Sequence, residues 1–218
     1  MNAALSSVRV CVWDFDGTFY LPNPDLWKKI RQAEYQTIVN HTGWTLAKAA
    51  EEFAKVHKVT VKSATETVGI LSGITTDEAS REMEQYFDRR EFVAYDEQLV
   101  TLLTKTLRSY THIILANGVK SNLLKTLEIL GIPEATFDCI VTSEMVGVNK
   151  PNSGGYEFIE IHTGLPREAH LMIGDREEVD LVTAKNRGWK TCLVHTDPVI
   201  GGWNSVLSSV YDIAGELV

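Results

Sequence analysis

Two aspartates, Asp14 and Asp16, stand one residue apart at the end of the apolar run in "VRVCVWDFDGT". In an extended chain, residues i and i+2 point to the same side, so both carboxylates can face one ligand. One carboxylate can attack phosphorus as a nucleophile, and the other can give a proton to the leaving oxygen and later take one from water. The pair therefore predicts combined nucleophilic and acid–base chemistry, although Asp, Gly and Thr in succession are also typical of a plain turn.

Polar residues also follow three later apolar runs. The run "IILANG" ends in residues 116–118, "VGVNKP" presents Lys150, and "LMIGDREEVD" presents Asp175 and then Asp180. Mg²⁺ commonly binds one or two carboxylates together with phosphate oxygens and water. We therefore expect Asp14 and Asp175 to bind Mg²⁺, and we expect Lys150 to neutralise charge on the phosphoryl group that is transferred.

The fold must bring these residues together. From about residue 93, segments with apolar residues three and four apart alternate with short apolar runs, which is typical of βα units. This alternation predicts an α/β fold, with a mainly parallel, Rossmann-like sheet, helices on both faces and right-handed crossovers. Ligands of such open sheets bind beyond the carboxyl ends of the strands, where all four polar stretches are expected.

The section between the first strand and residue 93 has a different pattern. Residues 25–43, 45–58 and 75–90 carry helical spacing, and no convincing strand pattern occurs among them. We expect a small α-helical domain of residues 22–92, inserted into a core formed by 1–21 and 93–218. The hinges are expected near residues 20–24 and 90–96.

Composition narrows the class of protein. The chain has 218 residues and a formal net charge of −8, so it lacks the basic surplus of a general nucleic-acid or anionic-membrane binder. No apolar run reaches the roughly 18 residues of a membrane span, and the first residues lack a signal-peptide pattern. The three cysteines lie in short apolar runs, which favours reduced, buried thiols. We expect a cytoplasmic protein whose partner is a small phosphorylated substrate, with neither nucleic acid nor membrane as a partner.

The motifs "DFDGT", "IILANG", "NKP" and "GDREEVD", in this order and spacing, resemble the haloacid dehalogenase superfamily of aspartate-nucleophile hydrolases. Most of its members are Mg²⁺-dependent phosphatases, and the resemblance covers the entire chain. It implies that Asp14 is the nucleophile. It also implies that Asp16 is the general acid/base and binds the metal through its backbone carbonyl.

The resemblance assigns further roles. Thr18 would stabilise the segment after the first strand and take part in phosphate binding, and Lys150 would balance charge. Asp175 and Asp180 would be acids on the metal side, with Asp180 supporting the direct ligands.

Residues 22–92 resemble the helical cap of one branch of the superfamily, which closes over the site and selects the substrate. Closure of such a cap excludes water during phosphoryl transfer. Dehalogenases of this superfamily lack a carboxylate at the position of Asp16, because halide leaves without a proton, and phosphonate-cleaving members also depart from the double-Asp pattern. Asp16 therefore favours phosphate esters.

One position departs from the family pattern. Ala116 stands where Ser or Thr normally donates a hydrogen bond to the phosphoryl group, and alanine has no donor to offer. The phosphate-binding segment is then Ala116, Asn117 and Gly118, with the backbone N–H or side-chain amide of Asn117 as the expected contact. We expect weakened rather than abolished phosphate binding.

The sequence thus predicts a Mg²⁺-dependent phosphatase that acts through an aspartyl-phosphate on a small phosphorylated metabolite, a sugar phosphate or a nucleotide. Two alternatives stay open. A phosphomutase of the same superfamily would use the same Asp14 and Asp16. A catalytically weak phosphate-binding or regulatory protein is supported only by Ala116.

Overall fold

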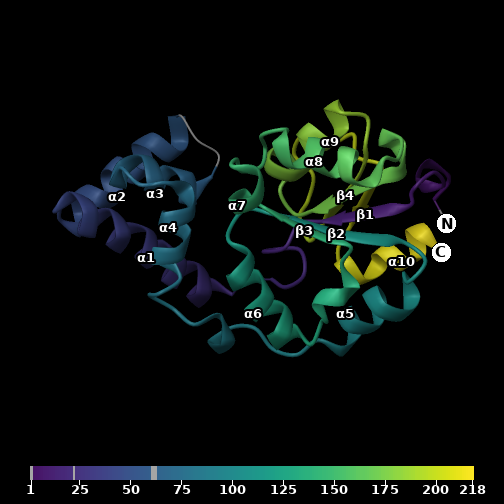
Figure 1. The fold of residues 1–218 in the computed structure, drawn as a ribbon, viewed down its shortest axis with the longest axis horizontal. Helices are drawn as coiled ribbons and strands as arrows, with labels where there is room; N and C mark the ends of the chain where they lie inside the picture. The colour runs from purple at the N-terminus through teal and green to yellow at the C-terminus, as the bar shows by residue number, and fades with distance from the viewer. Residues whose placement is uncertain (1, 22, 60–62) are drawn as a thin grey trace.

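A computed structural model describes residues 2–21, 23–59 and 63–218. Within these residues, six parallel strands form one sheet in the order β3-β2-β1-β4-β5-β6 (Figure 1). The strands are β1 (Val10–Trp13), β2 (Thr111–Ala116), β3 (Cys139–Thr142), β4 (His170–Gly174), β5 (Lys190–Val194) and β6 (Ser205–Leu207). The predicted parallel α/β sheet is confirmed, and β1, which carries the two aspartates, lies between β2 and β4.

β1 shows how the sequence forms two apolar faces. All four of its residues are buried, and their side chains alternate between the faces of the sheet. Cys11 and Trp13 join one apolar cluster, whereas Val10 and Val12 join another. A strand that is buried on both faces must be apolar throughout, which explains the continuous run in the sequence.

Helices cover both faces (Figure 1). One face packs against α5 (Glu97–Thr101) and the helical turn Leu102–Thr106, against α6 (Lys120–Leu130) and against α10 (Ile213–Leu217). The other packs against α8 (Gly154–Thr163) and against α9 (Val182–Asn186), which continues the helical turn Glu177–Leu181. The short helix α7 (Ser143–Val146) follows β3 directly.

The inserted section consists of α1 (Pro24–Thr42), α2 (Leu46–Val59), α3 (Ala64–Ser72) and α4 (Thr76–Met83), followed by the helical turn Arg89–Glu91. These helices lie to one side of the sheet in Figure 1. They pack around an apolar cluster of their own, which contains Ala33, Ile38, Ala49, Phe53, Val68, Ala79 and Met83. As predicted, the described residues between 23 and 92 contain no strand. The boundaries at 21/22 and 92/93 stay a prediction, and Pro22 lies outside the described residues.

Local signals explain where these helices begin. Asn23 caps α1 by accepting a hydrogen bond from the Leu26 N–H at 2.8 Å, and Pro24 occupies the first turn. Thr75 and Glu78 form a reciprocal capping box at the start of α4. α3 was not predicted because its Thr, Val, Ile and Gly residues are weak helix formers.

The structure differs from the sequence-based expectation at two strands. The sequence pattern predicts the third core strand over residues 137–144, but β3 covers only Cys139–Thr142 and α7 begins at Ser143. β6 was not predicted, because it has three residues at the edge of the sheet and only Ser205 among them is fully buried. Neither difference moves a predicted site residue away from the edge of the sheet.

Cys11 and Cys192 are buried as predicted, and Cys139 is partly buried. All three thiols are free, and burial raises the pKa of Cys192 to about 12. No helix among the described residues combines the length and the apolar character needed to cross a membrane.

Candidate active site

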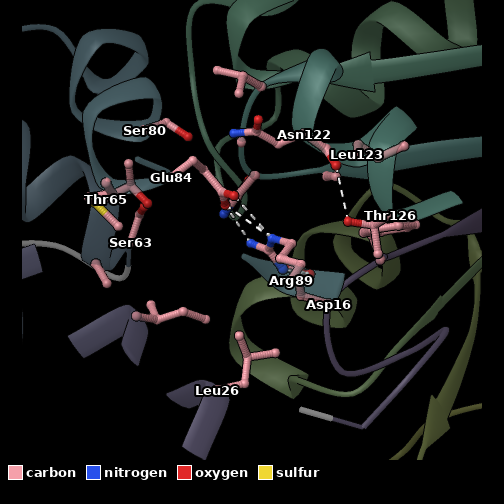
Figure 2. A pocket seen from close by; sticks show the side chains of 18 of the residues that line it. Asp16, Leu26, Ser63, Thr65, Ser80, Glu84, Arg89, Asn122, Leu123 and Thr126 are labelled. Carbon is pink, nitrogen blue, oxygen red and sulfur yellow. Dashed lines mark hydrogen bonds and ion pairs between the residues drawn. The ribbon is translucent and has the colours of Figure 1, made fainter. Parts of the chain in front are cut away.

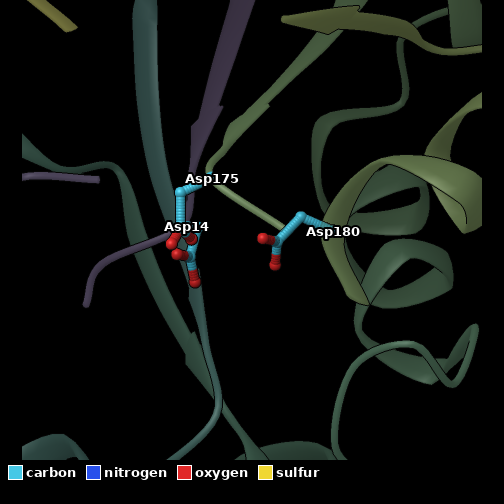
Figure 3. A group of neighbouring side chains, drawn as sticks. All are labelled: Asp14, Asp175 and Asp180. Carbon is cyan, nitrogen blue, oxygen red and sulfur yellow. The ribbon is translucent and has the colours of Figure 1, made fainter. Parts of the chain in front are cut away.

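The sheet brings the predicted acids together at the carboxyl ends of its central strands. Asp14 follows β1, and its N–H donates to the Ile173 carbonyl of β4 at 2.9 Å. Asp175 follows β4 directly, and Asp180 comes from the helical turn after it (Figure 3). Carboxylate oxygens of the three aspartates lie within 4.8 Å of one another.

This cluster has the chemistry of a divalent-cation site. Asp14 and Asp180 are buried and Asp175 is half-buried, and Oδ1 of Asp175 has no hydrogen-bond partner among the described residues. A buried carboxylate oxygen without a donor is costly unless a cation compensates it. Three carboxylates at this spacing suit Mg²⁺, which prefers hard oxygen ligands, so the residues present fit that ion.

The charges within the cluster shift its pKa values. Burial, together with the charges of Asp14 and Asp180, raises the pKa of Asp175 to about 7. Burial also raises the pKa of Asp180, and the charge of Asp14 adds to the effect. Burial opposes ionisation of Asp14 as well, but the charges of Lys150 and Arg176 outweigh it and hold the pKa of Asp14 below its usual value. Asp14 is thus the acid that the protein itself keeps ionised, as a nucleophile requires.

Lys150 lies at the centre of this arrangement. Its Nζ donates to Oδ1 of Asp14 and lies 2.8 Å from Oδ1 of Asp180, and the residue is only 3% exposed. Burial disfavours its charged form, yet the two aspartates raise its pKa above the usual value. The ammonium group therefore remains a fixed positive charge beside the predicted nucleophile.

Asn117 has a positioning contact that the sequence did not reveal. Its side-chain Oδ1 accepts from the Lys150 N–H at 2.7 Å, and its Nδ2 donates to the Lys150 carbonyl at 3.1 Å. The side-chain amide therefore holds the backbone of the cis Lys150–Pro151 segment. The predicted phosphate contact of Asn117 is left to its backbone N–H.

Residues near Asp14 hold the acids in place. Thr18 Oγ1 donates to Oδ2 of Asp14 at 3.1 Å, so both oxygens of that carboxylate have donors. Gly17 has φ of +90°, and a Cβ at this position would overlap the carboxylate of Asp175. A Cβ on Gly174 would come within 2.7 Å of the Asp180 Cβ. Each glycine leaves the space that a neighbouring acid fills.

Asp16 lies two residues beyond Asp14 and contacts both segments that join the core to the helical insertion. Its Oδ1 accepts from the Tyr20 hydroxyl and from Arg89 Nη1, the latter at 2.9 Å. Arg89 Nη2 also lies 2.8 Å from Oε1 of Glu84 (Figure 2). Oδ2 of Asp16 accepts no hydrogen bond from the described residues, which leaves it available to a ligand. The contact between Arg89 and Asp16 could not be predicted from local sequence, because 73 positions separate the two residues.

Ala116 and Gly118 lie where the phosphate-binding segment was predicted. Ala116 is the last residue of β2, and Gly118 exchanges hydrogen bonds with Ser143, donating from its N–H at 3.2 Å and accepting at its carbonyl at 2.9 Å. Arg176 is a cation that the sequence analysis missed. Its Nε lies 3.7 Å from Oδ1 of Asp175 and 4.0 Å from Oδ2 of Asp180.

A cavity of about 160 Å³ connects these residues to the helical insertion. Core residues form one wall, among them Asp16, Ala116, Asn117, Gly118, Asp175 and Arg176. Helices of the insertion form the other wall, with Leu26, Ser63, Ser80 and Glu84 (Figure 2). The site thus lies between the sheet edge and the inserted helices.

Comparison with known proteins agrees with this geometry. Residues 8–188 match the family model of the haloacid dehalogenase-like hydrolases. The chain belongs to the haloacid dehalogenase-like hydrolases. The resemblance read from "DFDGT" through "GDREEVD" is therefore confirmed at the level of the family.

Two curated relatives of this haloacid dehalogenase-like hydrolase align over part of the chain. One is the pyrimidine 5'-nucleotidase YjjG of Escherichia coli (strain K12), 38% identical over 80 residues, which are 36% of this chain and 35% of the relative. The other is a glyceraldehyde 3-phosphate phosphatase of Methanothermobacter thermautotrophicus, 31% identical over 97 residues, 44% of this chain and 42% of the relative. The alignments thus span well under half the length of either relative.

Solved structures share the fold of this hydrolase over nearly its full length. A phosphatase from Thermococcus onnurineus has a TM-score of 0.69 at 19% identity and covers 95% of this chain and 97% of its own. An L-2-haloacid dehalogenase from Xanthobacter autotrophicus has a TM-score of 0.60 at 14% identity, with coverage of 95% and 97%. Phosphatases and dehalogenases therefore share this fold, and the residues of the site must distinguish the two reactions.

Proposed function

We propose that this hydrolase is a Mg²⁺-dependent phosphatase that cleaves phosphate monoesters of small metabolites. The observation that carries the proposal is that two neighbouring carboxylates have different surroundings, which suit two different roles. Asp14 is held ionised against Lys150, and Asp16 lines the cavity with Oδ2 available. Dehalogenation needs only the first carboxylate, whereas an alcohol that leaves a phosphate ester needs a proton, which the second can supply. Both aligned curated relatives are also named for reactions at phosphate esters.

Asp14 and Asp16 would act in sequence. The Asp14 carboxylate attacks phosphorus, the bond from phosphorus to the leaving oxygen breaks, and Asp16 gives its proton to that oxygen. Asp16 then takes a proton from water, which attacks the aspartyl-phosphate and releases phosphate and free Asp14. Lys150 keeps its charge throughout and stabilises the transferring group.

Asp14, Asp175 and Asp180 would hold Mg²⁺, with the backbone carbonyl of Asp16 as a further ligand. Bound there, the ion supplies positive charge that offsets the charge of the phosphoryl oxygens. The backbone N–H of Asn117 and the guanidinium of Arg176 line the same cavity and would bind those oxygens in place of the hydroxyl that Ala116 lacks.

Phosphate release from a panel of phosphorylated metabolites, with and without Mg²⁺, tests this proposal. We expect release that depends on Mg²⁺ and stops when a chelator is added. Transfer of phosphate to a second sugar instead of water would identify the phosphomutase. Phosphate binding without turnover of any ester would support the non-catalytic alternative and contradict the proposal.

A further inference from the structure

The cavity continues from the predicted catalytic residues into the helical insertion, where one carboxyl group has no role in the chemistry above. Glu34 of α1 lines this cavity and is only 2% exposed. Its Oε2 is buried and accepts no hydrogen bond from the described residues, although Arg31 Nη1 lies 2.7 Å away. Arg31 offsets the charge of this carboxyl group, but the pair makes no well-aligned hydrogen bond, so the unused acceptor still has a cost in the free protein.

Each charged side chain in this part of the cavity already has a partner of opposite charge. Glu34 has the guanidinium of Arg31 beside it, and Arg89 pairs with Glu84 and with Asp16. A cationic ligand at Glu34 would meet Arg31, and an anionic one would meet the carboxylates. The leaving group that suits this wall is therefore uncharged.

Hydroxyl groups complete the wall. Ser63, Thr65 and Ser80 line the cavity, and so does the apolar Leu26 (Figure 2). Hydroxyl side chains can both donate and accept hydrogen bonds, so they suit a leaving group that carries hydroxyls better than a purely apolar leaving group. Together with Glu34, they make this end of the cavity polar.

The size of the cavity limits the ligand. Its volume is about 160 Å³, close to that of an engineered protein cavity of about 150 Å³ that binds benzene. A leaving group about the size of one six-membered ring fits such a space.

We propose that Glu34 determines substrate specificity by accepting a hydrogen bond from a hydroxyl of a small, uncharged polyol leaving group. This inference rests on the proposed phosphatase function and names the class of ester that the site prefers. Burial raises the pKa of Glu34 to about 7, against the opposing charge of Arg31, which agrees with a carboxyl group that lacks a donor. A hydroxyl of the substrate would supply that donor.

The test compares two esters with the same carbon skeleton, glycerol 3-phosphate and n-propyl phosphate, which differ only in hydroxyls. We expect the wild-type protein to prefer glycerol 3-phosphate in kcat/KM by about tenfold to a hundredfold. Glu34→Met keeps the length of the side chain but removes the acceptor, so this ratio should fall toward one. Glu66→Met, the same change on α3 outside the cavity, should leave the ratio at its wild-type value.

A structural role for Glu34 predicts another result. It would lower kcat/KM for both esters equally, and an unchanged ratio in Glu34→Met would overturn the inference. If that variant does not fold, Glu34→Leu takes its place. Leucine is shorter and also lacks an acceptor, so the ratio should again fall toward one, and an unchanged ratio again overturns the inference.

Failure of the proposed function is recognised separately with p-nitrophenyl phosphate, whose leaving group departs without recognition of a hydroxyl. No Mg²⁺-dependent release from any of the three esters would overturn the phosphatase proposal, and the role of Glu34 with it. Release from p-nitrophenyl phosphate without a preference between the other two would overturn the role of Glu34 alone.

Discussion

The surroundings of Asp14 suit the role of a nucleophile. Lys150 donates to one of its oxygens and Thr18 to the other, and the residue is buried. Held on both sides, the carboxylate loses little orientational freedom when it attacks, which is how a fixed nucleophile contributes to rate. The same burial makes the site sensitive to a change of one atom.

We predict that Asp14→Asn lowers kcat at least about a thousandfold, because the amide keeps the shape of the side chain but is not a nucleophile. The fold should persist, since Lys150 keeps Asp180 as a partner at 2.8 Å. Phosphate release and a thermal melt measure the two effects. Asp138→Asn, at a half-exposed acid paired with His162, is the control and should stay active. Turnover of Asp14→Asn at the wild-type rate would exclude the covalent mechanism.

Ala116 supplies the second prediction at this scale. A missing hydrogen bond to a charged phosphoryl oxygen costs roughly 1.5–3 kcal/mol, or about tenfold to a hundredfold in rate. Ala116→Ser should therefore raise kcat/KM, by up to about tenfold if Asn117 and Arg176 already replace part of the contact. Serine is the smaller change at the buried end of β2. Equal kcat/KM in a folded serine variant would mean that the missing donor is fully replaced.

These residues also show what a single sequence can predict about a site. The sequence predicted that Asp14, Asp175, Asp180 and Lys150 lie together, because each follows an apolar run and parallel strands end at one edge. The contact of Arg89 with Asp16 depends on how the insertion folds back, which no local pattern records. Either the backbone N–H or the side-chain amide of Asn117 was expected at the phosphate, and the side-chain amide is bonded to the backbone of Lys150, 33 positions away.

At the scale of elements, the turn after β1 decides how closely the acids approach. Gly17 bridges β1 and the segment leading to the insertion, and the Asp175 carboxylate occupies the place where its Cβ would be. The turn can therefore take only glycine without moving a predicted metal ligand.

We predict that Gly17→Ala weakens Mg²⁺ activation, because the new methyl group displaces the Asp175 carboxylate. The positive φ of residue 17 adds backbone strain of about 1 kcal/mol once alanine stands there. Gly164→Ala is the matched control, since φ there is +63° but nothing lies within 4 Å of the added Cβ. Gly17→Ala should lose more stability than Gly164→Ala, because the displaced carboxylate adds to the backbone strain, and only Gly17→Ala should need more Mg²⁺ for half-maximal phosphate release. Equal Mg²⁺ requirements in the two variants would contradict the role assigned to this contact.

The elements differ in how well the sequence predicted them, for physical reasons. β1 to β5 are apolar runs because helices cover both faces of the sheet, so their pattern was clear. β6 lies at the edge with little buried surface and left no such pattern. α3 contains Gly69, where a Cβ would lie 3.0 Å from the Ile74 carbonyl, so close packing there outweighs helix propensity.

For the whole molecule, ligand binding should raise the thermal stability of the folded protein. Mg²⁺ with beryllium fluoride mimics phosphorylated Asp14 and binds only the native state. At about one hundred times Kd this contributes roughly 2.7 kcal/mol, which for a chain of this length raises Tm by about 5–10 °C. The Asp14→Asn variant lacks the acceptor and should show no such rise. A wild-type Tm that is unchanged at saturating ligand would contradict an intact site.

Glu34 links stability to pH. Burial raises its pKa from 4.5 to about 7 in the folded protein. At pH values between 4.5 and about 7, the folded state keeps a proton on Glu34 that the unfolded state releases. The contribution of Glu34 to the free energy of unfolding is therefore complete below pH 4.5 and is lost as pH rises to about 7. The loss is on the order of 3 kcal/mol at 1.36 kcal/mol per pKa unit.

We therefore predict that Glu34→Gln, which cannot ionise, is more stable relative to wild type at pH ~8 than at pH ~5. Urea denaturation at both pH values measures the difference. Other titrating groups, including Asp175, are common to both proteins and largely cancel in the comparison. The same stability difference at both pH values would show that Glu34 does not keep its proton in the folded state.

The contacts of Asp16 have a consequence for how such proteins diversify. Tyr20 stands where the chain leaves the sheet, Arg89 stands where it returns, and both reach the same carboxylate oxygen. The two ends of the insertion are thus fixed side by side, and lengthening the chain between them adds only a slowly growing entropic cost. Because the inserted helices also have an apolar cluster of their own, they can be exchanged as a module without changing the register of the sheet. Substrate choice can then evolve while the aspartates at the strand ends, and the reaction they perform, stay the same.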